Sequence, residues 1–127
     1  MRTLAEKLRL PAGRVRIVNA SPGHHRALGS PTTSAEGPFD FVLLFVRDAA
    51  ELRRLGPDAV RAAKPQGLLW IAYPKGGSTR GATDLPASPW WHRRDVLGEY
   101  TGETGYRPVA QVAIDEDWTA LRFRQGT

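Results

Sequence analysis

Two stretches of the sequence place groups for ligand binding and proton transfer close together. The first follows an apolar segment and contains an amide, a hydroxyl, a glycine and an imidazole: Asn19, Ser21, Gly23 and His24. The second follows another apolar segment and combines cations with glycines and a hydroxyl: Lys75, Gly76, Gly77, Ser78 and Arg80. Glycines let a backbone approach a ligand closely, and cations and N–H groups attract anions. The pattern fits a crevice for a nucleotide or another anion between residues 19–25 and residues 75–80, although a basic loop exposed to water accounts for residues 75–80 more simply.

Neither stretch carries a complete nucleotide-binding motif. A glycine-rich fingerprint needs a glycine where Asn19 stands, and a phosphate loop needs a Gly-Lys-Ser/Thr order that the segment after Lys75 lacks. The histidines His24, His25 and His92 are acid–base candidates for an enzyme, but histidines on loops and at helix starts are more often ordinary surface residues. The sequence therefore assigns no catalytic residue and no cofactor, and it favours a binding protein over an enzyme.

An aromatic pair and an acidic run add further candidates. Trp90 and Trp91 precede His92, and an indole ring can pack in a core, lie in an interface or stack on a nucleobase. The three acids at residues 115–117 supply carboxylates, which bind metal ions, but they lack further oxygen ligands at loop spacing. A solvent-exposed hairpin turn accounts for this run better, so the sequence predicts no metal site.

The composition limits the classes of protein to which the chain can belong. The 127 residues include no cysteine, which excludes thiol catalysis, cysteine-ligated zinc and disulfides. The apolar runs at residues 41–46 and 68–73 are far shorter than the roughly 20 residues of a membrane-spanning helix. The alternating charges of residues 1–8 do not resemble a signal peptide. We expect a single domain over residues 1–127 that works in the cytoplasm, without membrane contact.

A basic balance raises the question of an anionic partner. The formal net charge is +5, and most of the basic residues are arginines spread along the chain rather than gathered in one tract. A diffuse excess supplies sequence-independent attraction to phosphates but no means of reading a base sequence. Nucleic acid is therefore one of the partners to test, although no motif supports it.

The N-terminal half of the chain alternates helical and strand patterns. Thr3 and Glu6 have the spacing of a capping box, which predicts a short helix over residues 4–9. Alternating apolar and basic residues predict a strand at residues 14–20 that lies at a sheet edge, followed by a tight turn and a short helix. The nearly continuous apolar run at residues 39–46 predicts a parallel strand that is buried on both faces.

The next segment completes a strand–helix–strand unit. Residues 48–63 predict a helix that breaks or kinks at Gly56 and Pro57. A turn at residues 64–67 then leads into a second buried strand at residues 68–73. Two buried strands joined by a helix of crossover length are typical of a parallel pair.

The C-terminal part predicts a helix and a hairpin. Ser88 and Pro89 are a cap and a first-turn proline, which predict a helix over residues 88–103. Residues 107–114 and 118–124 predict two strands joined by the acidic turn. The order of elements indicates a three-layer α/β fold with about five strands, in which a mainly parallel, Rossmann-like sheet ends in an antiparallel C-terminal hairpin.

The middle of the chain resembles a class I methyltransferase domain. The resemblance rests on the strand Phe-Asp-Phe-Val at residues 39–42 and the turn Lys-Pro-Gln-Gly at residues 64–67, which lie on either side of a helix. The closing hairpin is similar too, and the resemblance implies a last strand that inserts antiparallel beside its predecessor. The short span between the first two strands leaves no room for two further strand–helix units, so the chain resembles a truncated methyltransferase domain.

The whole length looks more closely like a family of small bacterial proteins of unknown function. The motifs that carry this similarity lie at residues 15–23, 70–75 and 112–123. Methyltransferases hold S-adenosylmethionine with a glycine-rich loop after the first strand and an acidic residue after the second. Residues 19–23 do not match that loop, so neither resemblance transfers a catalytic residue to this chain.

Three functions fit these observations. We expect a non-catalytic binding or interaction module that has lost S-adenosylmethionine binding, with an exposed first strand at which a homodimer or a protein partner could pair. The second is a nucleotide- or anion-binding protein, or a residual methyltransferase-like enzyme, that uses the crevice between residues 19–25 and 75–80. The third is a non-specific nucleic-acid binder in which Trp90 or Trp91 stacks on bases.

Overall fold

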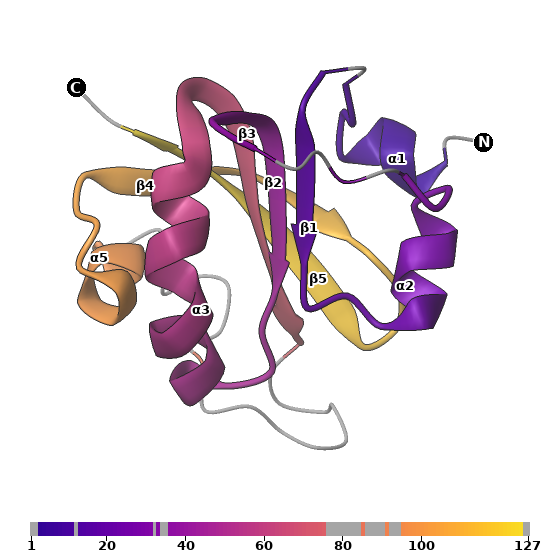
Figure 1. The fold of residues 1–127 in the computed structure, drawn as a ribbon. Coiled ribbons are helices and arrows are strands. Elements are labelled where there is room, and N and C mark those ends of the chain that lie inside the picture. The colour runs from indigo at the N-terminus through magenta and orange to yellow at the C-terminus, as the bar shows by residue number, and fades with distance from the viewer. Residues whose placement is uncertain are drawn as a thin grey trace.

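A five-stranded mixed sheet with helices on both faces forms the centre of the molecule (Figure 1). The structure is a computed structural model that describes residues 3–11, 13–31, 33, 36–75, 85, 91 and 95–125. The strands are β1 (Val15–Val18), β2 (Phe39–Phe45), β3 (Ala63–Pro74), β4 (Tyr106–Ala113) and β5 (Trp118–Gln125). The helices are α1 (Leu4–Lys7), α2 (Pro22–Ala27), α3 (Ala49–Ala62) and α5 (Val96–Thr101). This arrangement confirms the predicted α/β class.

The strand order β1-β2-β3-β5-β4 places the last strand between the two that precede it. β1, β2 and β3 are parallel neighbours, whereas β5 runs antiparallel to both β3 and β4. The parallel pair forms because α3 carries the chain from the end of β2 back to the start of β3. The mainly parallel sheet, the edge position of the first strand and the antiparallel closing hairpin are confirmed. Pairing of that edge with a second copy stays a prediction.

The two faces of the sheet support separate apolar cores. Successive residues of β2 point to opposite faces, so Phe41 belongs to one core and Val42 to the other. The Phe41 core includes Trp70, whose Nε1 donates to the carbonyl of Leu8 at 3.0 Å and so ties the end of α1 to the sheet. The Val42 core lies under α3 and α5. Burial on both faces explains why β2 is apolar almost throughout.

The capping box predicted for the first helix is present, whereas the predicted cap Ser88 and first-turn proline Pro89 lie outside the described residues. Thr3 and Glu6 form the complete capping box at α1. Asp48 caps α3 by accepting from the N–H of Glu51 at 2.9 Å, but the Glu51 carboxylate accepts from the N–H of Arg47 at 2.7 Å instead of returning to the cap. No helix among the described residues is both long and apolar enough to cross a membrane.

The predicted helix does not break at Gly56 and Pro57. α3 continues through Pro57 as one helix of 14 residues. The glycine before the proline has a packing role, because a Cβ at Gly56 would lie 2.6 Å from Cγ2 of Thr101 in α5. Close approach of two helices, rather than a turn, is therefore what selects glycine here.

Two other element boundaries differ from the prediction. β3 begins at Ala63, which pairs with Phe39, so the expected turn at residues 64–67 is an irregular part of the strand beside β2. The expected helix over residues 88–103 is not continuous, because α5 begins after its cap Asp95, whose ψ of 69° is not helical. It ends at Gly102, whose φ of 79° suits glycine.

Candidate functional site

Three of the predicted site residues, Asn19, Ser21 and His24, meet at the carboxyl ends of β1 and β2. An open pocket of about 400 Å³ lies there, lined by Asn19, Ala20, Ser21, His24, Phe45, Arg47 and Trp118. Open α/β sheets bind their ligands at this edge, outside the ends of the parallel strands. Trp118 reaches it because β5 runs antiparallel to β3 and therefore begins where β3 ends. We name this cavity the carboxyl-edge pocket.

Asn19 lines the carboxyl-edge pocket and holds the neighbouring elements together. Its φ of 64° turns the chain sharply after β1. Its Nδ2 donates to the carbonyl of Phe45 at 2.9 Å and lies 3.3 Å from Oε1 of Glu51. Burial raises the pKa of Glu51, but hydrogen bonds from Arg47 and Asn19 outweigh it and hold that pKa below its ordinary value. The amide therefore links β1, β2 and the start of α3.

The turn into α2 offers an anion few free donors. Ser21 is the N-cap, and its Oγ accepts from the N–H of His24 at 3.1 Å. The Ser21 carbonyl accepts from the N–H of His25 at 2.9 Å, and Pro22 has no N–H. Of the five residues from Ser21 to His25, Ser21 and Gly23 have N–H groups that make no hydrogen bond within the turn. A bound phosphate would therefore have at most two backbone donors here.

An aromatic cluster forms one wall of the pocket. The imidazole of His24 stacks on Phe45 with ring centroids 4.8 Å apart and meets Trp118 edge-on at 5.3 Å. Phe45 and Trp118 also contact each other, with centroids 5.6 Å apart. The side chain of His24 is only 14% exposed, so both of its ring faces are largely covered. This wall can accept a flat apolar ring more readily than a charged group.

Asp115 joins the aromatic wall to the second predicted stretch. Its Oδ2 lies 2.9 Å from Nε2 of His24, and its carbonyl accepts from Nζ of Lys75 at 2.8 Å. Its Oδ1 accepts from the N–H groups of Asp117 and Trp118, each at 2.8 Å. Burial raises the pKa of Asp115, but the hydrogen bonds from His24, Asp117 and Trp118 outweigh it and lower that pKa overall. Residues 19–25 and Lys75 thus belong to one connected edge.

The remaining sequence candidates divide into two groups. Trp91 is in the core, 1% exposed and packed against Tyr73 and Phe123, so it is neither a stacking site nor an exposed interface residue. Outside the described residues lie Gly76, Gly77, Ser78, Arg80, Trp90 and His92. Among the described residues, no group of three histidine, aspartate or glutamate side chains is placed to hold a metal ion.

Several residues of this edge were not predicted from the sequence. From the sequence, Phe45 was expected to be a buried strand residue, Trp118 the first residue of a hairpin strand, and Asp115 part of a solvent-exposed turn. The available signal was the topology implied by the methyltransferase resemblance, because an inserted antiparallel last strand places its first residues at the carboxyl edge. Arg47 carried no signal beyond its position after a buried strand.

Comparison with solved structures identifies relatives of the fold. The ribosomal protein L11 methylase of Lactobacillus delbrueckii subsp. bulgaricus superposes with a TM-score of 0.57 over 97% of this chain and 75% of that one, at 12% identity. The chain has a methyltransferase-like fold. LepI in complex with SAM matches at a TM-score of 0.41 and 14% identity, over 96% of this chain and 39% of that one. No protein-family model and no curated protein matches the sequence.

Proposed function

We propose that this protein is a non-catalytic module that binds a small planar ligand in the carboxyl-edge pocket. The supporting observation is that the polar groups around the pocket already have protein partners. His24 and Lys75 both contact Asp115, and the guanidinium of Arg47 lies 3.2 Å from the Glu51 carboxylate. Groups held in this way shape a pocket, whereas acid–base catalysis needs a group that reaches the reacting atom.

The shape and chemistry of the pocket favour a flat, largely uncharged ligand. Its volume of about 400 Å³ falls within the range of small-molecule sites, and the half-buried ring of Trp118 beside Phe45 and His24 provides a surface for ring stacking. The guanidinium of Arg47 lies at the rim and is 72% exposed, so it is placed to attract a polar substituent that extends into solvent. A nucleoside has this combination of a flat ring and a polar tail.

We further propose that the pocket has lost S-adenosylmethionine binding. The L11 methylase shares the fold, but here Asn19 occupies the turn after β1 in a left-handed conformation that glycine commonly takes. The following helix begins with a proline and has six residues, which leaves few backbone donors for the cofactor's carboxylate. These features support a protein that keeps the fold of the methylase but binds a ligand other than S-adenosylmethionine.

Calorimetry on the whole chain tests the ligand class. The probes are adenosine, AMP and S-adenosylmethionine, each titrated into wild type, Trp118→Ala and Trp118→Phe. We expect adenosine or AMP to bind, Trp118→Ala to weaken that binding about tenfold, and Trp118→Phe to retain most of it, because stacking on an aromatic ring contributes about 1–3 kcal/mol per base. S-adenosylmethionine should give no heat at millimolar concentration.

Two results would overturn parts of this proposal separately. Micromolar binding of S-adenosylmethionine would show that the cofactor site is retained. The absence of heat from all three probes would reject the planar ligand, while leaving the fold assignment untouched.

An enzyme is the second candidate, in which the nitrogen of His24 that does not contact Asp115 would reach the substrate. A carboxylate that holds one imidazole nitrogen fixes the tautomer of the ring and leaves the other nitrogen as an acceptor, which is the arrangement of a general base. The test supplies S-adenosylmethionine with a small phenol or amine as the methyl acceptor, whose proton would pass to His24, and measures formation of S-adenosylhomocysteine by wild type, His24→Gln and Asp115→Asn. Formation that both variants reduce would favour the enzyme over the binding module.

A further inference from the structure

A second open pocket, of about 440 Å³, lies at the opposite end of the sheet from the carboxyl-edge pocket. It opens between the start of β3 and the end of β5, next to the turn that follows α1. Its lining consists of Arg9, Pro65, Gln66, Gly67, Leu68, Arg122, Phe123 and Arg124. We name it the arginine pocket, because three of its eight lining residues are arginines that come from the two ends of the sequence.

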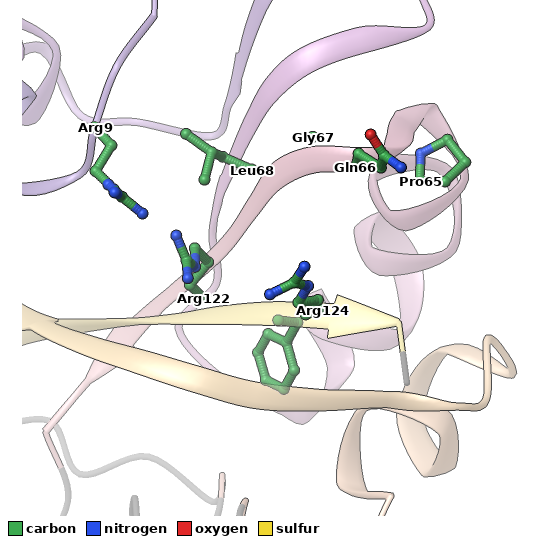
Figure 2. Close-up of a pocket in the computed structure, with 8 residues that line it drawn as sticks. Arg9, Pro65, Gln66, Gly67, Leu68, Arg122 and Arg124 are labelled. Carbon is green, nitrogen blue, oxygen red and sulfur yellow. The ribbon is translucent and has the colours of Figure 1, made fainter. Parts of the chain in front are cut away.

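The three guanidinium groups share one space. Figure 2 shows the side chain of Arg9 directed toward that of Arg122, and Arg124 directed toward the start of β3. Arg122 and Arg124 lie on the same face of β5 because they are two residues apart. Arg107 of β4 is the register partner of Arg124, so it extends the row of cations on that face. The hairpin and the turn after α1 together therefore gather positive charge on one surface.

Among the described residues, no acidic side chain neutralises this concentration of charge. In the described part of the chain, no carboxylate forms an ion pair with Arg9, Arg122 or Arg124, although Arg47, Arg54, Arg61 and Lys64 all have acidic partners. Burial and the neighbouring charges of Arg9 and Arg124 lower the pKa of Arg122. Like charges held together without counter-ions oppose folding, so packing does not explain this cluster.

The backbone of Arg9 adds an independent observation. Its φ is 62°, the left-handed conformation in which glycine usually ends a helix. The N–H of the next residue, Leu10, donates to the carbonyl of Ala5 at 2.9 Å, which is the bond that closes such a helix end. A bulky residue in this conformation is strained, and strained residues are typical of functional sites. The sequence keeps an arginine where glycine would be more stable.

We propose that Arg9, Arg122 and Arg124 form a binding site for the phosphate groups of a ligand that carries two or more of them. Guanidinium groups bind phosphate oxygens through paired hydrogen bonds, which is why clusters of arginine recognise phosphates. The ligand is a condensed phosphate or the backbone of a single-stranded nucleic acid, which share this chemistry. The site is independent of the planar ligand proposed for the carboxyl-edge pocket.

Calorimetry at low salt tests the site with two probes, pyrophosphate and a single-stranded oligonucleotide of mixed sequence. Arg122→Gln removes a guanidinium from the pocket, and Arg26→Gln makes the same charge change on the exposed surface of α2. We expect Arg122→Gln to weaken binding about tenfold, the equivalent of one charge-assisted hydrogen bond, and Arg26→Gln to change it little. For the oligonucleotide, Arg122→Gln should also reduce the slope of log K against log salt by about 0.7.

Arg9→Gly separates binding from stability. Glycine adopts the observed φ without strain and removes one of the clustered charges, so we expect the unliganded variant to melt at a higher temperature than wild type. The same variant should bind pyrophosphate or the oligonucleotide more weakly. A purely structural role for Arg9 predicts a lower melting temperature, so a fall in melting temperature would contradict the proposal even if the affinity also falls.

The two probes also identify the source of the phosphate. Binding of both, with competition between them, supports a site that either source can fill. Binding of pyrophosphate alone indicates a condensed phosphate, and binding of the oligonucleotide alone indicates a nucleic acid. Equal weakening by Arg122→Gln and Arg26→Gln, or no binding of either probe at low salt, would overturn the proposal.

Discussion

Asn19 stabilises the end of β1 through both its backbone and its amide. Its φ of 64° is strained for alanine but not for glycine, and both substitutions remove the hydrogen bond to Phe45. We expect Asn19→Ala to lower the free energy of unfolding by about 2 kcal/mol and Asn19→Gly by about 1 kcal/mol. Urea unfolding measures the two values. If alanine and glycine cost the same, the left-handed backbone contributes nothing and the amide alone holds this turn.

The acid stability of the fold depends in part on Asp115. A carboxyl group whose pKa is lower in the folded than in the unfolded protein stabilises the fold at any pH above its ordinary pKa of 3.8. That stabilisation is lost as the pH falls through the lower pKa of the folded state. We expect Asp115→Asn to be less stable than wild type near neutral pH, and the difference to vanish at strongly acidic pH. The loss should stay below about 1 kcal/mol, because solvent screens a side chain that is 45% exposed.

The matched control for this pH dependence is Asp117→Asn, which changes an exposed acid on the same turn. Asp40 and Glu51 also have lowered pKa values and contribute acid sensitivity in the same direction, so only the difference between wild type and each variant is informative. Melting temperatures from neutral pH down to pH 2 give this difference. A constant gap between wild type and Asp115→Asn across the whole range would contradict the linkage.

At the scale of elements, Gly56 decides how closely α3 and α5 pack. Gly56→Ala normally favours a helix, but the new Cβ would lie 2.6 Å from Cγ2 of Thr101 and 3.2 Å from Cδ1 of Leu52. We expect the variant to lose about 1–2 kcal/mol of unfolding free energy, because overpacking outweighs helix propensity. Thr101→Ser removes the clashing methyl group and keeps the hydroxyl that donates to Leu97 at 2.8 Å.

The double variant provides the measurement that tests this contact. In a double-mutant cycle monitored by urea unfolding, we expect Gly56→Ala to cost less in the Thr101→Ser background than in wild type. Additive losses would mean that the cost arises within α3 and not from the helix–helix contact.

The same glycine shows which elements could be predicted from sequence and which could not. β2 was predicted correctly because a strand buried on both faces is an almost continuous apolar run. α1 was predicted correctly because its capping box depends only on Thr3 and Glu6, which are close together in the sequence. The break at Gly56 was predicted from a local rule, whereas the structure selects glycine for its contact with Thr101, 45 positions away in the sequence. Boundaries set by tertiary contacts leave no local signal.

At the scale of the molecule, the two pockets also differ in how far the sequence could predict them. Asn19 and His24 were identified because they follow a predicted strand at the ligand-binding edge of an α/β sheet. The arginine pocket was not identified, because Arg9 and Arg122 are far apart in a sequence whose arginines are spread evenly. Only the insertion of β5 beside β3 and the position of α1 bring them together.

The whole molecule should unfold in a single step, because both cores depend on the same strands. β2 supplies Phe41 and Leu43 to one face and Val42 to the other, and β3 is shared in the same way. Loss of packing on one face therefore loosens the strands that hold the other. We expect Leu43→Ala, which creates a cavity on the face that holds Trp70, to cost about 2–5 kcal/mol and to destabilise both faces equally.

Fluorine NMR of protein labelled with 5-fluorotryptophan measures each face during urea unfolding. Trp70 reports on the Leu43 face and Trp91 on the opposite face. Within each protein, the native resonances of Trp70 and Trp91 should disappear at the same urea concentration. That concentration should be lower for Leu43→Ala than for wild type. Leu52→Ala, a matched cavity on the Trp91 face, should shift both midpoints in the same way. A Leu43→Ala variant that lowers only the Trp70 midpoint would show two independently folding layers rather than one domain.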